Sequence, residues 1–135
     1  MYTKHKSWYL IDAQNQTLGR LATCVTQILR GKDQVTYLPY LDTGHYVIII
    51  NADKVRITGK KAFQKIYYRH SGKPGHLKQK RFHERQRSLP ESIIKIAVKG
   101  MLPKNSLAKQ QLTKLKVYKS SEHPHRAQKP TLVNI

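Results

Sequence analysis

The stretch HYVIIINADKVRIT, residues 45–58, decides the fold. Its first half is an unbroken apolar run, rich in β-branched residues and too short to form a helix of its own. Such a run is typical of a strand that is covered on both faces, as in a parallel sheet. The second half, KVRIT, alternates between apolar and polar residues. This alternation predicts a half-buried strand whose basic face carries Lys54 and Arg56.

Two elements are expected before this stretch. SWYLID, residues 7–12, is short, aromatic and apolar, which indicates a strand. The next segment has apolar residues at helical spacing, with Thr17 as the expected N-cap and Gly31 as the C-terminal stop. Its apolar stripe consists of Leu18, Leu21, Ala22, Val25, Ile28 and Leu29. A strand, a helix and a buried strand in succession predict an α/β unit with parallel strands.

Further elements are expected after it. KIYYRH, residues 65–70, is another strand-type run, and SGKPGH, residues 71–76, is rich in turn residues. A helix is predicted to begin at Ser88, which has capping-box spacing to Glu91, and to end near Gly100. Pro90 suits its first turn, and Pro103 follows its end.

The C-terminal part is predicted to hold one more helix and an arm. The helix covers residues 106–118, with Leu107, Ala108, Leu112 and Leu115 directed inward and with Lys109, Lys114 and Lys116 as its basic complement. Residues 120–135 read as an extended C-terminal arm. We therefore expect one domain, residues 1–135, of the α/β class: a central, mostly parallel sheet flanked by helices, with extended basic loops and that arm.

The charge of the chain restricts its function. There are 26 Lys and Arg residues against 7 Asp and Glu, a formal net charge of +19, which an anionic partner must normally neutralise. Nucleic acid fits best. A membrane partner is not expected, because the longest apolar run, from Val47 to Ile50, is far below the roughly 20 residues of a membrane-spanning helix. The single cysteine, Cys24, excludes an internal disulfide and reads as a small buried side chain.

Three motifs suggest catalysis or metal binding, and each has a simpler reading. Residues 42–44, Asp-Thr-Gly, match an aspartic-protease motif, but the helical pattern argues against that all-β class, and Asp and Gly favour turns. Residues 58–60, Thr-Gly-Lys, lack the earlier glycine and the following Ser or Thr of a phosphate-binding loop. The histidines lack zinc-site spacing; they are His5, His45, His70, His76, His83, His123 and His125. We expect no catalytic residues, no metal and no cofactor.

Basic residues interleaved with aromatic ones favour nucleic acid. KKAFQKIYYRHSGKPGHLKQKR, residues 60–81, combines lysines and arginines with Tyr67, Tyr68 and His70, which can stack or donate hydrogen bonds. The lysines and arginines provide salt-sensitive affinity without specifying a sequence. The alternative is a solvated basic surface with one of the tyrosines in the core.

The blocks SWYLIDAQNQTLGRLAT, YLDTGHYVIIINADKVRITGKK, YYRHSGKPG, VKGMLPKN and LKVYKSSEHPHRAQKP occur in order over residues 7–130. On them the chain resembles the bacterial- and plastid-type large-subunit ribosomal protein thirteen family. The resemblance implies a structural, non-enzymatic constituent of the large subunit that binds its ribosomal RNA directly and supports early assembly. It also implies neighbouring large-subunit proteins as partners, no small-molecule substrate, and a location on ribosomes of the plastid stroma or bacterial cytoplasm.

The expected RNA contacts lie in the matching blocks. They are Lys54, Arg56, Lys60, Lys61, Tyr68, Arg69, His70, Lys73, Lys104, Asn105, Lys116, His123, His125 and Arg126. A rival interpretation remains open at this point: a free RNA-binding regulator or RNA chaperone would carry the same basic surface.

Overall fold

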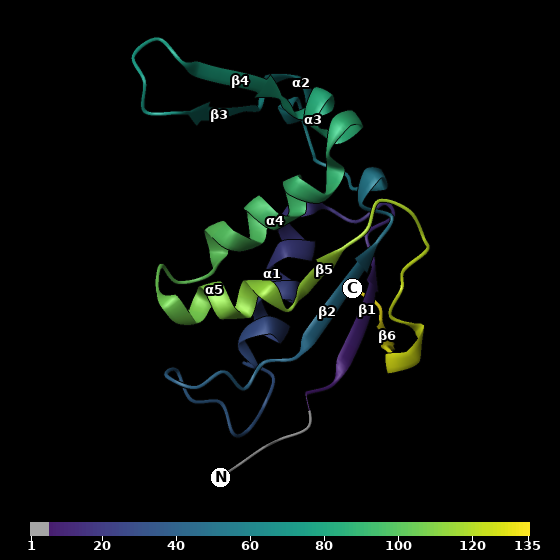
Figure 1. Ribbon diagram of the computed structural model, residues 1–135. Coiled ribbons are helices and arrows are strands. Elements are labelled where there is room, and N and C mark those ends of the chain that lie inside the picture. Colours follow the sequence, from purple (N-terminus) through teal and green to yellow (C-terminus); the bar gives the residue numbers. More distant parts are fainter. Residues whose placement is uncertain (1–5) are drawn as a thin grey trace.

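Four parallel strands form the central sheet of the computed structural model, which describes residues 6–135 (Figure 1). The strands are β1 (Trp8–Asp12), β2 (Tyr46–Ile50), β5 (Leu115–Val117) and β6 (Thr131–Val133). Their order across the sheet is β5-β2-β1-β6, and all three pairs of neighbours are parallel. The predicted α/β class with a mostly parallel sheet is confirmed.

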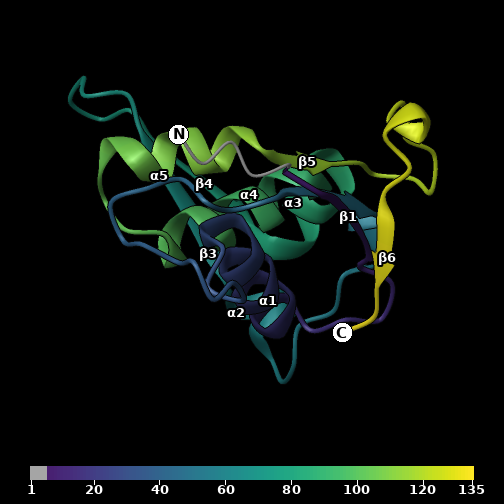
Figure 2. The same cartoon turned by 90° about the horizontal axis from the view of Figure 1, so that it is seen from below.

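Three helices, α1 (Leu18–Arg30), α4 (Pro90–Met101) and α5 (Ser106–Thr113), lie on one side of the sheet. The C-terminal segment runs along its other side, as Figures 1 and 2 show. Helix α1 is the predicted one: its stripe is buried, and it ends at Gly31, whose φ of 72° is the left-handed conformation that glycine adopts without strain. Thr17 is its N-cap residue but makes no side-chain capping bond.

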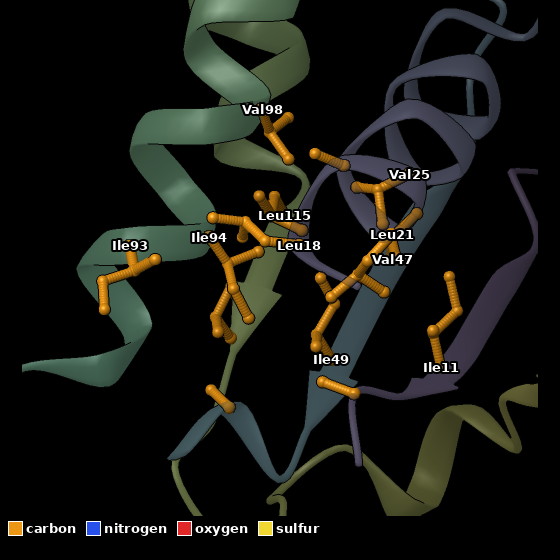
Figure 3. Close-up of a cluster of buried hydrophobic side chains, with 14 of the residues drawn as sticks. Ile11, Leu18, Leu21, Val25, Val47, Ile49, Ile93, Ile94, Val98 and Leu115 are labelled. Atoms are coloured by element: carbon orange, nitrogen blue, oxygen red, sulfur yellow. The ribbon is translucent and has the colours of Figure 1, made fainter. Parts of the chain in front are cut away.

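The core lies between the sheet and the helices (Figure 3). Alternate strand residues, such as Ile11, Val47 and Ile49, pack against the stripe of α1 and against α4. Each fully buried side chain of this size stabilises the fold by about 1.5–3 kcal/mol relative to exposure. The side chains drawn and labelled are those of Ile11, Leu18, Leu21, Val25, Val47, Ile49, Ile93, Ile94, Val98 and Leu115.

Strand β2 is covered on both faces, as its sequence predicts. Val47, Ile48 and Ile49 all have no accessible surface. Because side chains alternate along a strand, Ile48 lies on the face opposite to Val47 and Ile49, which pack in the core with the helices. On that second face the Trp8 ring of β1 stacks on Tyr46 with centroids 4.3 Å apart. The cover therefore consists of helices on one side and of the C-terminal segment on the other.

The predicted strand over residues 54–58 is wrong. Asn51 has a φ of 55° and is followed by the 3-10 helix η1 (Ala52–Lys54), so the chain turns away from the sheet after β2. Arg56 then makes only an isolated bridge with Thr17. The alternation is real, because Val55 is buried while Arg56 is exposed, but no neighbouring strand is available for pairing.

The predicted helix over residues 106–118 is correct only in its first part. It ends at Thr113, and Leu115–Val117 form β5, which pairs with β2. Leu115 and Val117 both enter the core from this strand. Lys114, expected among the exposed lysines, is only 4% exposed.

The start of α4 also differs from the prediction. The helix begins at Pro90, and its N-cap residue is Leu89 without a side-chain capping bond. Ser88 ends a separate short helix, α3 (Phe82–Ser88), and its hydroxyl donates back to the Arg85 carbonyl. The capping box between Ser88 and Glu91 is therefore wrong, whereas Pro90 in the first turn is confirmed.

An antiparallel hairpin stands apart from the sheet (Figure 1). It consists of β3 (Ile66–His70), β4 (Leu77–Arg81) and the turn between them, with the short helix α2 (Lys61–Gln64) before it and α3 after it. Strand β3 and the turn are as predicted. Strand β4 was not predicted, because it has no apolar alternation: all five of its residues are exposed.

The C-terminal segment is not an unpacked arm throughout. After the 3-10 helix η2 (Arg126–Gln128) the chain forms β6, which pairs with β1 at the edge of the sheet. The expectation that no part of residues 120–135 packs is therefore wrong for its last part. Within the part of the chain that the structure describes, no helix is long and apolar enough to cross a membrane.

Candidate nucleic-acid interface

The β3–β4 hairpin has two different faces. Because side chains alternate along a strand, Tyr67 and Arg69 share one face with their partners Lys80 and Lys78. Like charges directly opposite each other destabilise a strand pair, and Arg69 stands directly opposite Lys78. The other face carries Tyr68, His70 and Leu77. An isolated two-stranded hairpin of this kind is marginally stable in water, so an external anion would stabilise it.

The segment that contains the hairpin, residues 54–81, is entirely cationic. It holds ten Lys or Arg residues and no Asp or Glu. Among residues 6–135, none of these ten has an acidic side chain within 4.0 Å. We call residues 54–81 the basic segment. Such a concentration of unneutralised charge attracts a polyanion.

Packing at the base of the hairpin fixes its position. Tyr67 lies between two cations, with Lys65 Nζ 5.4 Å and Arg85 4.9 Å from the ring centroid. Burial raises the pKa of Tyr67, and the nearby Arg85 charge opposes this shift. Phe82 is buried, and its N–H donates to the Lys65 carbonyl. Tyr67 is thus the tyrosine at the core boundary, while Tyr68 is 62% exposed.

Glycines form the tip of the hairpin. Gly75 has a φ of 76° after Pro74, and the His76 N–H donates to the Lys73 carbonyl, the signature of a type II turn. The His70 ring accepts a bond from the Gly72 N–H through Nδ1. Lys73 is therefore the first residue of a short, defined turn at the tip of the hairpin.

The structure brings eight of the candidate residues together. Gln86 of α3 donates to the carbonyls of Asp53 and Val55, which holds Lys54 and Arg56 beside the base of the hairpin. The eight residues are Lys54, Arg56, Lys60, Lys61, Tyr68, Arg69, His70 and Lys73, and all are exposed. The candidate set omitted Lys78, Lys80 and Arg81, although they lie in the same charged run. Their place beside β3 depends on the pairing of β4.

Two candidates lie elsewhere, at the corner between α4 and α5. Lys104 is exposed, but Asn105 is the N-cap of α5, and its Oδ1 accepts a bond from the Ala108 N–H at 2.8 Å. Its position before a helical run was a signal for this role. RNA contact at these two positions stays a prediction.

The remaining four candidates belong to strand β5 and to the C-terminal segment, which lies on the side of the sheet opposite the helices (Figure 1). Lys116 belongs to β5, while His123, His125 and Arg126 belong to the C-terminal segment. The His125 Nε2 is 2.7 Å from the Tyr118 hydroxyl, and its ring lies 5.1 Å from that of Trp8. Burial and the neighbouring His123 and Lys116 lower the pKa of His125. These contacts attach the segment to the sheet, and RNA binding here also stays a prediction.

The Asp-Thr-Gly motif serves a structural purpose. The Asp42 carboxylate accepts bonds from Lys6 and from Lys114, whose Nζ also donates to the Gly44 carbonyl at 2.9 Å. Burial opposes the ionisation of Asp42, but these two lysines hold its pKa below the usual value. Burial lowers the pKa of Lys114, and Asp42 opposes that shift. A Cβ at position 44 would lie 1.7 Å from the Leu29 carbonyl oxygen, so only glycine fits.

The other two motifs can also be placed. Gly59, in the Thr-Gly-Lys sequence, has a φ of 68° in an exposed turn before α2. Among residues 6–135 no three His, Cys, Asp or Glu side chains are close enough to hold a metal ion, and His5 lies outside the described residues. Cys24 is partly exposed, against the expectation of a buried side chain, and its burial raises the pKa of the thiol.

The fold and its surface together define a class: a small α/β protein whose projecting cationic hairpin is suited to a polyanion. The model of the ribosomal protein L13 family matches residues 6–124, which is most of the chain. The chain belongs to this family, whose members are structural components of the ribosome and not enzymes. The Asp-Thr-Gly sequence is accordingly no protease site.

Close relatives occur in cyanobacteria. The chain is 59% identical over 133 residues to a protein of Gloeothece citriformis, and the aligned region covers 98% of this chain and 88% of the relative. It is 57% identical over 132 residues to a protein of Prochlorococcus marinus subsp. pastoris, with 98% and 92% covered. It is 58% identical over 130 residues to one of Synechococcus elongatus, with 96% and 86% covered. All three are large ribosomal subunit proteins of the type uL13.

Proposed function

We propose that this protein is a structural constituent of the large ribosomal subunit that binds large-subunit ribosomal RNA directly through the basic segment, residues 54–81. It supports early assembly of that subunit, on ribosomes of a bacterial cytoplasm or a plastid stroma. The names and the cyanobacterial origin of the relatives support the subunit and the location. One observation supports the mode of binding: the exposed hairpin in which Arg69 faces Lys78 with no acidic partner.

The two faces of the hairpin provide two kinds of contact. Phosphates neutralise the face with Arg69, Lys78 and Lys80, and their binding removes the repulsion across the strands. An unpaired base stacks on Tyr68, whose ring is 62% exposed on the other face. The hairpin therefore inserts between RNA segments, and contacts with the RNA on both of its faces stabilise its folded conformation.

A charge-matched pair of variants tests the phosphate face. We expect R69Q/K78Q to weaken binding to large-subunit ribosomal RNA and to reduce the slope of log affinity against log salt by roughly 1.5, for two lost phosphate contacts. The control K32Q/K95Q removes the same charge from exposed positions outside the basic segment. It should leave the slope nearly unchanged. Equal effects of the two variants would refute the assignment and leave only unspecific attraction.

Stability provides an internal control for the same variant. Removing two facing like charges should leave the melting temperature unchanged or raise it slightly. Y68A should cost about 1–3 kcal/mol of RNA affinity through lost stacking, with the salt slope intact. A loss of affinity together with a loss of folding would not support a contact role for either position.

Sedimentation of an extract at moderately high salt tests the ribosomal role itself. The protein should travel with the large subunit and survive the wash. Recovery near the top of the gradient would instead support a free RNA-binding regulator or chaperone. The subunit can also be reconstituted from its RNA and proteins in stages. Omitting this protein from the first stage should reduce the amount of other subunit proteins that bind in the later stages. If the other proteins bind in full without it, a role in early assembly is refuted.

A further inference from the structure

The loop between α1 and β2 lies at the end of the molecule opposite the hairpin (Figure 1). It exposes several apolar side chains. Val35 is fully exposed, Tyr40 is 73% exposed, and Leu38 and Leu41 are exposed to 40% and 47%. We call residues 32–44 the apolar loop. Four large apolar side chains exposed within seven residues of one connection are typical of an interaction surface.

Side-chain and backbone contacts hold the apolar loop in place. The Tyr37 hydroxyl accepts a bond from Arg30 at 3.0 Å, and the Gln34 side chain bonds to the His45 ring. At the end of the loop, Asp42 is bound by Lys6 and by Lys114. Backbone turns close within it, from the Gln34 N–H to the Gly31 carbonyl and from the Leu41 N–H to the Leu38 carbonyl. The exposure of its apolar residues is therefore built into the fold.

The charge of the apolar loop differs from that of the basic segment. Residues 32–44 contain one lysine and two aspartates, whereas residues 54–81 contain ten cations and no acid. Phosphate-rich surfaces are bound by lysine and arginine. With one cation among its 13 residues, the apolar loop offers phosphates far fewer partners than the basic segment does.

Charge also argues against a second copy of this chain as the occupant. Two molecules of charge +19 repel each other, and the apolar loop carries too few acidic groups to offset that repulsion. The remaining occupant is a different protein that presents an apolar surface. Exposed tyrosine and leucine side chains suit such a contact, since aromatic residues are enriched and charged ones depleted at protein interfaces.

We infer that the apolar loop docks a neighbouring protein of the large ribosomal subunit, with Val35, Leu38, Tyr40 and Leu41 as its apolar contacts. This inference rests on the proposed ribosomal function. It divides the surface in two: the basic segment faces RNA, and the apolar loop at the opposite end faces protein.

Opposite charge changes at the same two positions test the nature of the partner. V35E/Y40E and V35K/Y40K alter exposed side chains, so both variants should fold with an unchanged melting temperature. Both should bind protein-free large-subunit ribosomal RNA within twofold of the unchanged protein. Both should be incorporated at least fivefold less well when they compete with it for assembly into subunits reconstituted from RNA and total proteins. Weaker binding of the Glu variant to protein-free RNA with tighter binding of the Lys variant would overturn the inference.

Crosslinking identifies the occupant directly. A benzophenone side chain at position 35, in protein assembled into whole large subunits, should crosslink to another subunit protein. A crosslink to RNA, a crosslink to a second copy, or no crosslink in subunits that contain the protein would each overturn the inference. Failure of the proposed function has a different signature: R69Q/K78Q would then bind RNA normally, or the protein would be absent from large subunits.

Discussion

Replacing Asp42 by asparagine should strongly destabilise the protein, because it removes the only carboxylate near a buried ammonium group within the described residues. The Lys114 side chain is only 5% exposed, and its Nζ donates to Asp42 at 2.5 Å, to the Gly44 carbonyl at 2.9 Å and to the Leu29 carbonyl at 3.5 Å. These three acceptors use all the donors of the group. Asparagine keeps the shape of the side chain but leaves the positive charge uncompensated.

The expected cost follows from the burial of the two partners. Breaking a buried ion pair by removing one partner costs about 3–5 kcal/mol. The Asp42 side chain is 19% exposed, which permits some hydration of the site and places D42N at the lower end, about 3 kcal/mol. For a chain of this length that corresponds to a fall of roughly 10 °C in melting temperature.

A double-mutant cycle isolates the pair. K114M should cost less than D42N, because Asp42 is partly exposed and retains its 2.8 Å contact with Lys6. D42N/K114M should resemble K114M alone, since no buried charge is then left unpaired, so the coupling should equal the cost of D42N itself, about 3 kcal/mol.

Urea unfolding followed by the fluorescence of Trp8, the single tryptophan, measures these differences, because its ring stacks on Tyr46 in the folded state. The control E91Q breaks the exposed pair between Glu91 and Lys95 and should cost no more than about 0.5 kcal/mol. A cost below about 1 kcal/mol for D42N, or additive costs in the cycle, would refute the reasoning.

Three further predictions concern pH, packing and RNA. The pKa of Asp42 is lowered in the folded protein, so its contribution to the free energy of unfolding is complete above the usual carboxyl pKa and is lost as the pH falls through the lowered pKa. The difference in stability between the unchanged protein and D42N, measured by urea unfolding, should therefore shrink in acid. G44A should cost at least about 2 kcal/mol in urea unfolding, because its Cβ would collide with the Leu29 carbonyl, whereas G100A in α4 has open space and should be neutral or stabilising. K104A should reduce RNA affinity and lower the salt slope by about one; an unchanged slope would remove Lys104 from the candidate set.

Local sequence patterns predicted the elements whose own residues determine them. The stripe from Leu18 to Leu29 gives one helical face, and Gly31 ends it in a left-handed conformation. The run in β2 was recognised as covered on both faces because it contains no polar position. The errors occurred where tertiary partners decide. The segment Leu115–Val117 continues the helical spacing of Leu112, yet it becomes a strand because β2 offers an edge for pairing.

The candidate site was predicted in its charge but not in its arrangement. Exposure of Lys60, Arg69 and Lys73 follows from their chemistry, and the turn at Pro74 follows from its residue types. The place of β4 does not, because all five of its residues are exposed and only Leu77 among them is apolar. Lys114 was the least predictable residue, since a lysine is almost never buried without a partner and Asp42 is distant in the sequence.

The sheet joins the two ends of the chain, and this has a consequence for the order of folding. Strand β1 pairs with β2 and, on its other edge, with β6, which is synthesised after the other three strands of the sheet. During synthesis the outer edge of β1 stays open until residues 131–133 emerge, and open strand edges invite aggregation. The hairpin, by contrast, pairs residues close in sequence, so it has the low contact order of a fast-forming element. All residues of the charged projection are therefore available before the sheet is closed.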